Sequence, residues 1–174
     1  LDLGGQGGSG GAGDAVSVTL NSGSSVHTGG DGAHAVIAQS IGGGGGIGGD
    51  ATGGHLDFTP YGTTTNSSGG DADSVNVNAN ATIETSGAGA FGILAQSIGG
   101  GGGIGGDRSS SVAGSTGYSS GNSGTVTITQ AGSLTASGSG SIGIFAQSDA
   151  PFTPGNISVT VNGTVAGGSG DQGS

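Results

Sequence analysis

The sequence predicts an all-β protein: a right-handed parallel β-helix (β-solenoid) with about three strands per rung and glycine-rich insertions between the rungs. Three observations predict this fold class. Glycine supplies 47 of the 174 residues, roughly four times ordinary usage; one block of sequence recurs; and the apolar residues gather in short Val/Ile/Leu runs. Collagen is excluded because the chain has only three prolines, and a disordered linker would not concentrate its apolar residues in runs.

The recurring block ends in an Ala-Gln-Ser tract. Ala-Gln-Ser-Ile followed by GGGGGIGGD occupies 38–50 and returns unchanged at 95–107, and a third Ala-Gln-Ser stands at 146–148. A valine precedes each glutamine by 21 positions, and a further apolar residue follows each valine by 8 positions. The equivalent pairs are therefore Val18 and Val26, Val75 and Ile83, and Val126 and Leu134, with a fourth copy at Ile157 and Val165.

The spacing divides the chain into rungs and insertions within a single solenoid fragment, 1–174, which we expect to be the interior of a longer protein. We expect rung 1 at about 16–41, an insertion at 42–72, rung 2 at about 73–98, an insertion at 99–123, rung 3 at about 124–148, a loop at 149–155, a partial rung 4 at 156–166 and an open tail at 167–174.

Each rung contains three segments of strand character. In the third copy they are 126–130, 133–136 and 142–147, separated by turn residues at 131–132 and 137–140. Val126 and Ile128 alternate with threonines, so they share one face of a strand. Nothing between the segments has helical periodicity. Parallel crossovers almost always coil right-handed, which predicts the hand of the helix.

Stacked rungs align equivalent residues in columns. We expect the Val36, Ile93 and Ile144 column, and the alanines two residues further on, to line a narrow interior. The opposite face carries a second apolar column of Ile37, Leu94 and Phe145, and our hypothesis is that the insertions fold back over it. Gln39, Gln96 and Gln147 share that face and are placed to form an amide ladder along the axis.

Composition argues against several classes of function. The net charge is −10 with a single Arg, which argues against binding to nucleic acid or an anionic membrane. The chain has neither Lys nor Cys, so a Schiff base, a P-loop lysine, a disulfide framework and a thiolate site are all excluded. We expect no enzyme activity and no catalytic, cofactor-binding or metal site.

Calcium is the one cofactor alternative. GGIGGD at 45–50 and 102–107 matches half of a calcium-binding repeat, but the two copies are not in tandem, so Asp50 and Asp107 are interpreted as turn residues. The glycine patterns at 43–48 and 7–11 resemble nucleotide-binding and nucleophile motifs without the helix that either requires.

The remaining candidate residues are histidines, acids and loop aromatics. We expect His34 to be partly buried in the column of Phe91 and Ile142, and His27 to be solvated beside Glu84 and Thr135. His55 has no metal-ligand spacing, and Asp71 and Asp73 are expected to be solvated loop acids. Aromatics in the loops at 55–61 and 150–154, Phe152 among them, are expected to pin these loops against the rod, with ligand binding as the alternative.

The tract Ile/Val-x-Ala-Gln-Ser-Ile-Gly-Gly-Gly-Gly-Gly at 36–46 and 93–103 resembles a repeat common in the passenger regions of Gram-negative autotransporters. The resemblance extends over about 16–165. It implies a β-helical passenger, secreted through an outer-membrane barrel and displayed on the cell surface, commonly as an adhesin. The implied partners are a host or abiotic surface, or the surface proteins or glycans of neighbouring cells; this segment itself would not insert into a membrane.

The expected function is therefore a non-enzymatic, adhesin-like role at the Gram-negative cell surface. One alternative is a subunit whose open ends associate end to end into an extracellular fibre. Another is a calcium- or ice-binding solenoid. Ice binding is suggested by the outward-facing Thr127 and Thr129, although the equivalent positions Thr19 and Asn76 do not keep a regular threonine array.

Overall fold

The computed structural model describes residues 8–44, 69–100 and 121–169, and within them the chain forms strands and no helix. No helix in these ranges is therefore long and apolar enough to cross a membrane. The strands are β1 Val16–Leu20, β2 Ser25–Thr28, β3 Val36–Ile41, β4 Val75–Ala79, β5 Thr82–Thr85, β6 Phe91–Ile98, β7 Val126–Gln130, β8 Ser133–Ala136, β9 Ile142–Asp149, β10 Ile157–Val161 and β11 Thr164–Ala166.

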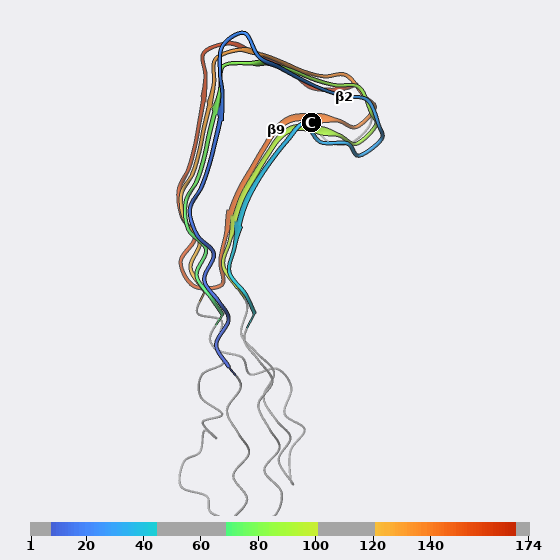
Figure 1. Cartoon of the computed structure of the whole chain (residues 1–174). Coiled ribbons are helices and arrows are strands. Elements are labelled where there is room, and N and C mark those ends of the chain that lie inside the picture. The colour runs from blue at the N-terminus through green and yellow to red at the C-terminus, as the bar shows by residue number, and fades with distance from the viewer. Residues whose placement is uncertain (1–7, 45–68, 101–120, 170–174) are drawn as a thin grey trace, which may run out of the picture.

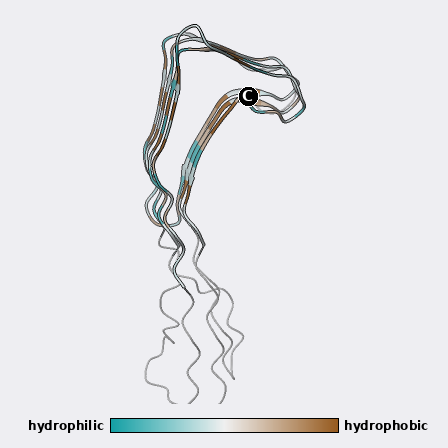
Figure 2. Ribbon diagram, in the orientation of Figure 1, coloured by the Kyte–Doolittle hydropathy of each residue, from teal (hydrophilic) through white to brown (hydrophobic). Residues whose placement is uncertain are grey.

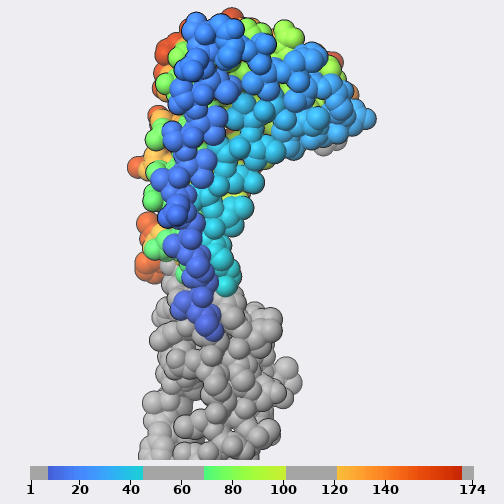
Figure 3. Space-filling view, viewed as in Figure 1, coloured from blue at the N-terminus to red at the C-terminus, as the bar shows by residue number. Residues whose placement is uncertain are grey.

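The strands form three parallel sheets in which successive copies of the repeat lie side by side. The first sheet has the order β1-β4-β7-β10, the second β2-β5-β8-β11 and the third β3-β6-β9. The copies overlie one another in Figure 1, and residues of the first copy fill the near end of the stack in Figure 3. The strands expected at 126–130 and 133–136 are confirmed, and the third strand of that copy continues to Asp149.

The register of the first copy differs from the sequence alignment by two residues. Val75 pairs with Val16 and not with Val18, although Val26 and Ile83 are paired as expected. The cause is a difference in turn length. The turn between β1 and β2 runs over 21–24, whereas the equivalent turn between β4 and β5 is only 80–81. The longer turn contains Gly23 at a φ of 83°, a conformation that glycine adopts readily.

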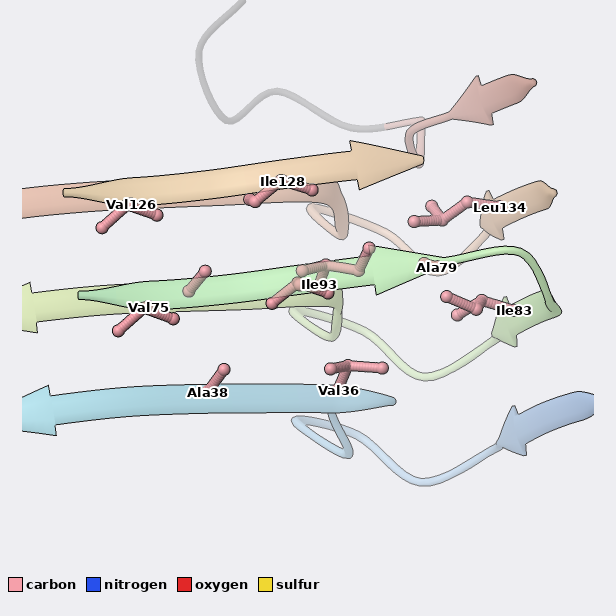
Figure 4. Close-up of a cluster of buried hydrophobic side chains, with 11 residues drawn as sticks. Val36, Ala38, Val75, Ala79, Ile83, Ile93, Val126, Ile128 and Leu134 are labelled. Atoms are coloured by element: carbon pink, nitrogen blue, oxygen red, sulfur yellow. The ribbon is translucent and has the colours of Figure 1, made fainter. Parts of the chain in front are cut away.

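The core lies between the sheets and consists of the inward columns. Val36 is 6% exposed and Ile93 is fully buried, and the alanines two residues further on, Ala38 and Ala95, are 1% and 0% exposed. Ile144 packs against this cluster from the third copy, so the predicted interior column is confirmed. In Figure 4 the side chains of Val36, Ala38 and Ile93 lie in one cluster with Val75 and Val126 of the first sheet. Burial of each Val or Ile contributes about 1.5–3 kcal/mol.

Successive copies stack so closely at the turn before the third strand that no side chain fits there. A Cβ on Gly87 would lie 1.9 Å from the carbonyl oxygen of Gly30, and one on Gly138 would lie 2.0 Å from that of Gly87. Real Cβ atoms do not approach so closely, so glycine is required here by the neighbouring rung. The abundance of glycine therefore has a packing cause in addition to its role in turns.

The first and third sheets approach each other toward the lower end of the fold in Figure 1, where glycine-rich backbone from both sides meets. Gly43 donates its N–H to the Gly11 carbonyl over 2.8 Å, and the Gly43 carbonyl accepts from Gly70 over 2.8 Å. Gly100 then donates to the Gly70 carbonyl over 2.9 Å. We call this alternating set of backbone bonds the glycine seam. It closes the cross-section without side chains and joins the two ends of the first insertion.

Candidate interaction surface

The outer face of the third sheet is the most unusual surface of the described chain, because apolar and amide columns alternate on it. We call it the ladder face. Its columns are Ile37, Leu94 and Phe145; Gln39, Gln96 and Gln147; and Ile41, Ile98 and Asp149. Ile37 and Ile41 are 53% and 52% exposed. Figure 2 shows the resulting band of apolar residues along this sheet, interrupted by a hydrophilic stripe.

The central column of the ladder face is a hydrogen-bonded amide ladder, as the sequence predicted. Gln39 Nε2 donates to Gln96 Oε1 over 2.5 Å, and Gln96 Nε2 donates to Gln147 Oε1 over 2.7 Å. Both bonds run in the same direction along the stack. Because an amide has two N–H donors and two acceptor lone pairs, Gln96 keeps one donor and one acceptor site after these bonds form.

Three rings from successive copies form a row that ends on the ladder face at Phe145. The His34 ring lies 4.7 Å from that of Phe91, centroid to centroid, and the Phe91 ring lies 5.6 Å from that of Phe145. The Phe91 N–H donates to His34 Nδ1 over 3.0 Å, which fixes the imidazole as an acceptor at that nitrogen. His34 is half-buried in the Phe91 column, so its predicted position is confirmed.

A column of inward serines lies beneath the ladder face. Ser97 Oγ donates to the Asp73 carbonyl over 2.8 Å and accepts from the Gly124 N–H over 2.8 Å. Ser148 repeats the arrangement with Gly124 and Gly155, each over 2.9 Å. These hydroxyls connect the third sheet to the segment that enters the next copy. We call them the serine clamp. Sequence reasoning missed it, although the recurrence of Ser at an inward position was a visible signal.

Several acids and both histidines of the described ranges have partners within the protein. His27 is exposed as predicted, and its Nδ1 lies 3.3 Å from Glu84 Oε2; both side chains are more than half exposed, so the pair contributes little stability. Asp71 Oδ1 accepts from the backbone and side-chain nitrogens of Asn122, and Asp73 accepts from Ser74 N–H. No three His, Cys, Asp or Glu residues are grouped for metal binding in these ranges.

Phe152 contradicts one expectation. It is 72% exposed and does not pin its loop against the rod. The loop that holds it, 150–154, is short and has proline on both sides of the ring, which restricts the backbone from folding back. The ring projects into solvent, where the alternative of ligand binding remains open.

The outward threonines do not form a regular array. Thr127 aligns with Asn76 and, after the correction to the register, with Ser17 in place of Thr19. Each position of that column therefore differs from the next. The flat, repeated threonine surface on which the ice-binding alternative depends is absent from the first sheet.

Several sequence candidates lie wholly or partly outside the described residues. These are Asp50, Asp107, His55, the loop at 55–61, and the glycine patterns at 7–11 and 43–48. The insertions expected to cover the Ile37, Leu94 and Phe145 column also lie largely there. No protein family, curated protein or solved structure matches this chain.

Proposed function

We propose that this chain is a segment of a right-handed parallel β-helix, with three strands per rung, displayed at the surface of a Gram-negative cell as a non-enzymatic, adhesin-like element. One observation supports the proposal: the first three copies each add a strand to all three parallel sheets, and the fourth adds a strand to the first two sheets, so each added copy lengthens the stack. An elongated stack holds its distal copies away from the membrane, and repeated faces give multivalent contact.

The residues of the Ala-Gln-Ser-Ile-Gly tract support a stacking role over a catalytic one. In the second copy, Ala95 fills the narrow interior, Gln96 joins the ladder and Ser97 forms the clamp. Gly99 follows, where a Cβ would lie 2.7 Å from the Gly121 carbonyl oxygen. Each position thus has a physical reason that concerns the neighbouring copy. Such a tract suits a protein that extends by adding copies and presents their outer faces to solvent.

The test is a display and adhesion assay with the native gene. Antibodies against residues 16–166 should label intact cells, and an in-frame deletion of these residues should reduce adhesion to the host or abiotic surface that the wild-type cells bind. Labelling only after permeabilisation would contradict surface display. An unchanged adhesion in the deletion strain, with the shortened protein still displayed, would contradict the adhesin role.

A self-stacking fibre subunit is the second candidate. Ile157, Val159 and Val161 of β10 and Val165 of β11 are 39–49% exposed at the last described copy, whereas the equivalent Val126 and Ile128 are fully buried. A further rung would bury them, whether it comes from the same chain or from another molecule. Sedimentation of the purified chain distinguishes the candidates, because monodisperse short rods would count against a fibre.

A further inference from the structure

The ladder face is nearly uncharged in a strongly acidic protein. The chain has a net charge of −10, yet the three columns of the ladder face include a single charged side chain, Asp149, at the end of the third-copy strand β9. No cation lies on the face to attract an anionic polymer, and the overall negative charge would repel one. The electrostatics therefore argue against an anionic occupant, and a face with one carboxylate offers a cationic polymer few partners.

The ladder face repeats along the stack. Its amide column recurs once per copy, at the strand spacing of about 4.8 Å. A narrow, extended molecule that lies along the stack meets the same amide in each copy, and its contacts accumulate with the number of copies. This repetition favours a linear polymer with repeating units of its own.

The chemistry of the ladder face matches hydroxyl groups beside apolar ring surfaces. Each glutamine of the ladder presents amide hydrogen-bonding capacity at strand spacing, and the ladder bonds hold these groups in place before a ligand arrives. Little entropy is then lost when a ligand binds. The row of His34, Phe91 and Phe145 provides the ring surface on which the C–H face of a sugar packs.

We infer that the ladder face binds a neutral, unbranched polysaccharide that lies along the stack, with its hydroxyls on the glutamine amides and its sugar rings against the row of aromatic rings. The inference rests on the proposed function, because it names the ligand of the displayed surface. Longer stacks with the same face would bind the polymer more tightly, since each copy adds a further contact to the same chain of sugars.

Affinity electrophoresis tests the inference directly. The purified chain is run through native gels that contain hydroxyethyl cellulose, mixed-linkage β-glucan or glucomannan, and through gels with carboxymethyl cellulose as an anionic polymer of matched backbone. We expect retardation by at least one neutral polymer and none by carboxymethyl cellulose. Phe145→Ala should weaken the retardation at least fivefold, and so should Ile37→Ser, whose 53% exposure makes it tolerable to the fold.

Thr127→Ala on the outer face of the first sheet is the matched control and should bind like wild type. Circular dichroism confirms that each variant is folded. The inference is overturned if folded wild-type chain passes all three neutral gels unretarded, if carboxymethyl cellulose retards it equally, or if the ladder-face variants bind like the control. Loss of gel binding with surface display intact refutes this inference alone, whereas gel binding by a chain that is never displayed refutes the proposed location.

Discussion

Ser97→Ala tests whether the serine clamp holds the first and third sheets together. The Ser97 side chain is fully buried, and its hydroxyl both donates to the Asp73 carbonyl and accepts from the Gly124 N–H, each over 2.8 Å. Alanine keeps the packing of Cβ but leaves both backbone groups without this partner. An unpaired buried group costs about 1–3 kcal/mol, so the loss falls between about 2 and 6 kcal/mol.

The lower end of that range is the better expectation for Ser97→Ala. Asp73 and Gly124 are not fully buried, so water reaches their backbone groups once the hydroxyl is gone. A loss of about 2 kcal/mol lowers the Tm of a domain of this size by roughly 5 °C. Ser40 is the first-copy member of the Ser97 column, and among the described residues its hydroxyl accepts one bond, from the Asp73 N–H, so Ser40→Ala should lose about half as much.

Thermal unfolding followed by circular dichroism at 218 nm measures both clamp variants. Ser25→Ala is the matched control, because Ser25 lies exposed in β2 and none of the described side-chain hydrogen bonds involves it. Its Tm should stay within about 2 °C of wild type, since exposed substitutions rarely change stability by more than about 0.5 kcal/mol. A Ser97→Ala variant as stable as Ser25→Ala would refute the clamp.

The other predictions concern a buried glutamine in the core, a glycine where successive copies stack closely, and the first insertion. Gln130→Leu should raise the stability by about 1–3 kcal/mol, because neither amide atom of this fully buried side chain has a hydrogen-bond partner among the described residues; an unchanged or lower urea midpoint would contradict this. Gly87→Ala should cost about 1–3 kcal/mol in the same assay, whereas Gly11→Ala, where a Cβ meets nothing within 4 Å, should cost less. Replacing 44–69 by the loop 149–155 should preserve the circular dichroism spectrum, because the seam already joins Gly43 to Gly70; loss of β structure would show that the insertion supports the stack.

Features with a short period were predictable from the sequence. Alternation along 126–130 placed Val126 and Ile128 in the core, and the recurrence of an Ala-Gln-Ser tract in three copies predicted the amide ladder. Both depend only on strand periodicity and on identical residues meeting in adjacent rungs. The register predicted for the first copy was wrong, because the alignment of Val18 with Val75 assumed that the turn after this strand has the same length in every copy.

Features that depend on closure of the cross-section were not predictable. The Ser97 hydroxyl contacts Asp73 and Gly124, which belong to segments 24 and 27 residues away and to different copies. Their contact with the third sheet depends on how sharply the first and third sheets converge. Periodicity contains no information about that angle. The glycine seam has the same origin, since its partners are set by the approach of two backbones.

The ladder glutamines and the ring residues carry different information about function. A ladder bond forms only if the adjacent copy also supplies an amide, so stacking alone explains why Gln96 has a glutamine on either side. Stacking makes no such demand on the neighbouring outward column, where Leu94 in one copy aligns with Phe145 in the next. Loss of polymer binding in Gln96→Ala would therefore mix a structural effect with a binding effect. Loss in Phe145→Ala at an unchanged Tm has no explanation in stacking, and it is the result that assigns a ligand to this face.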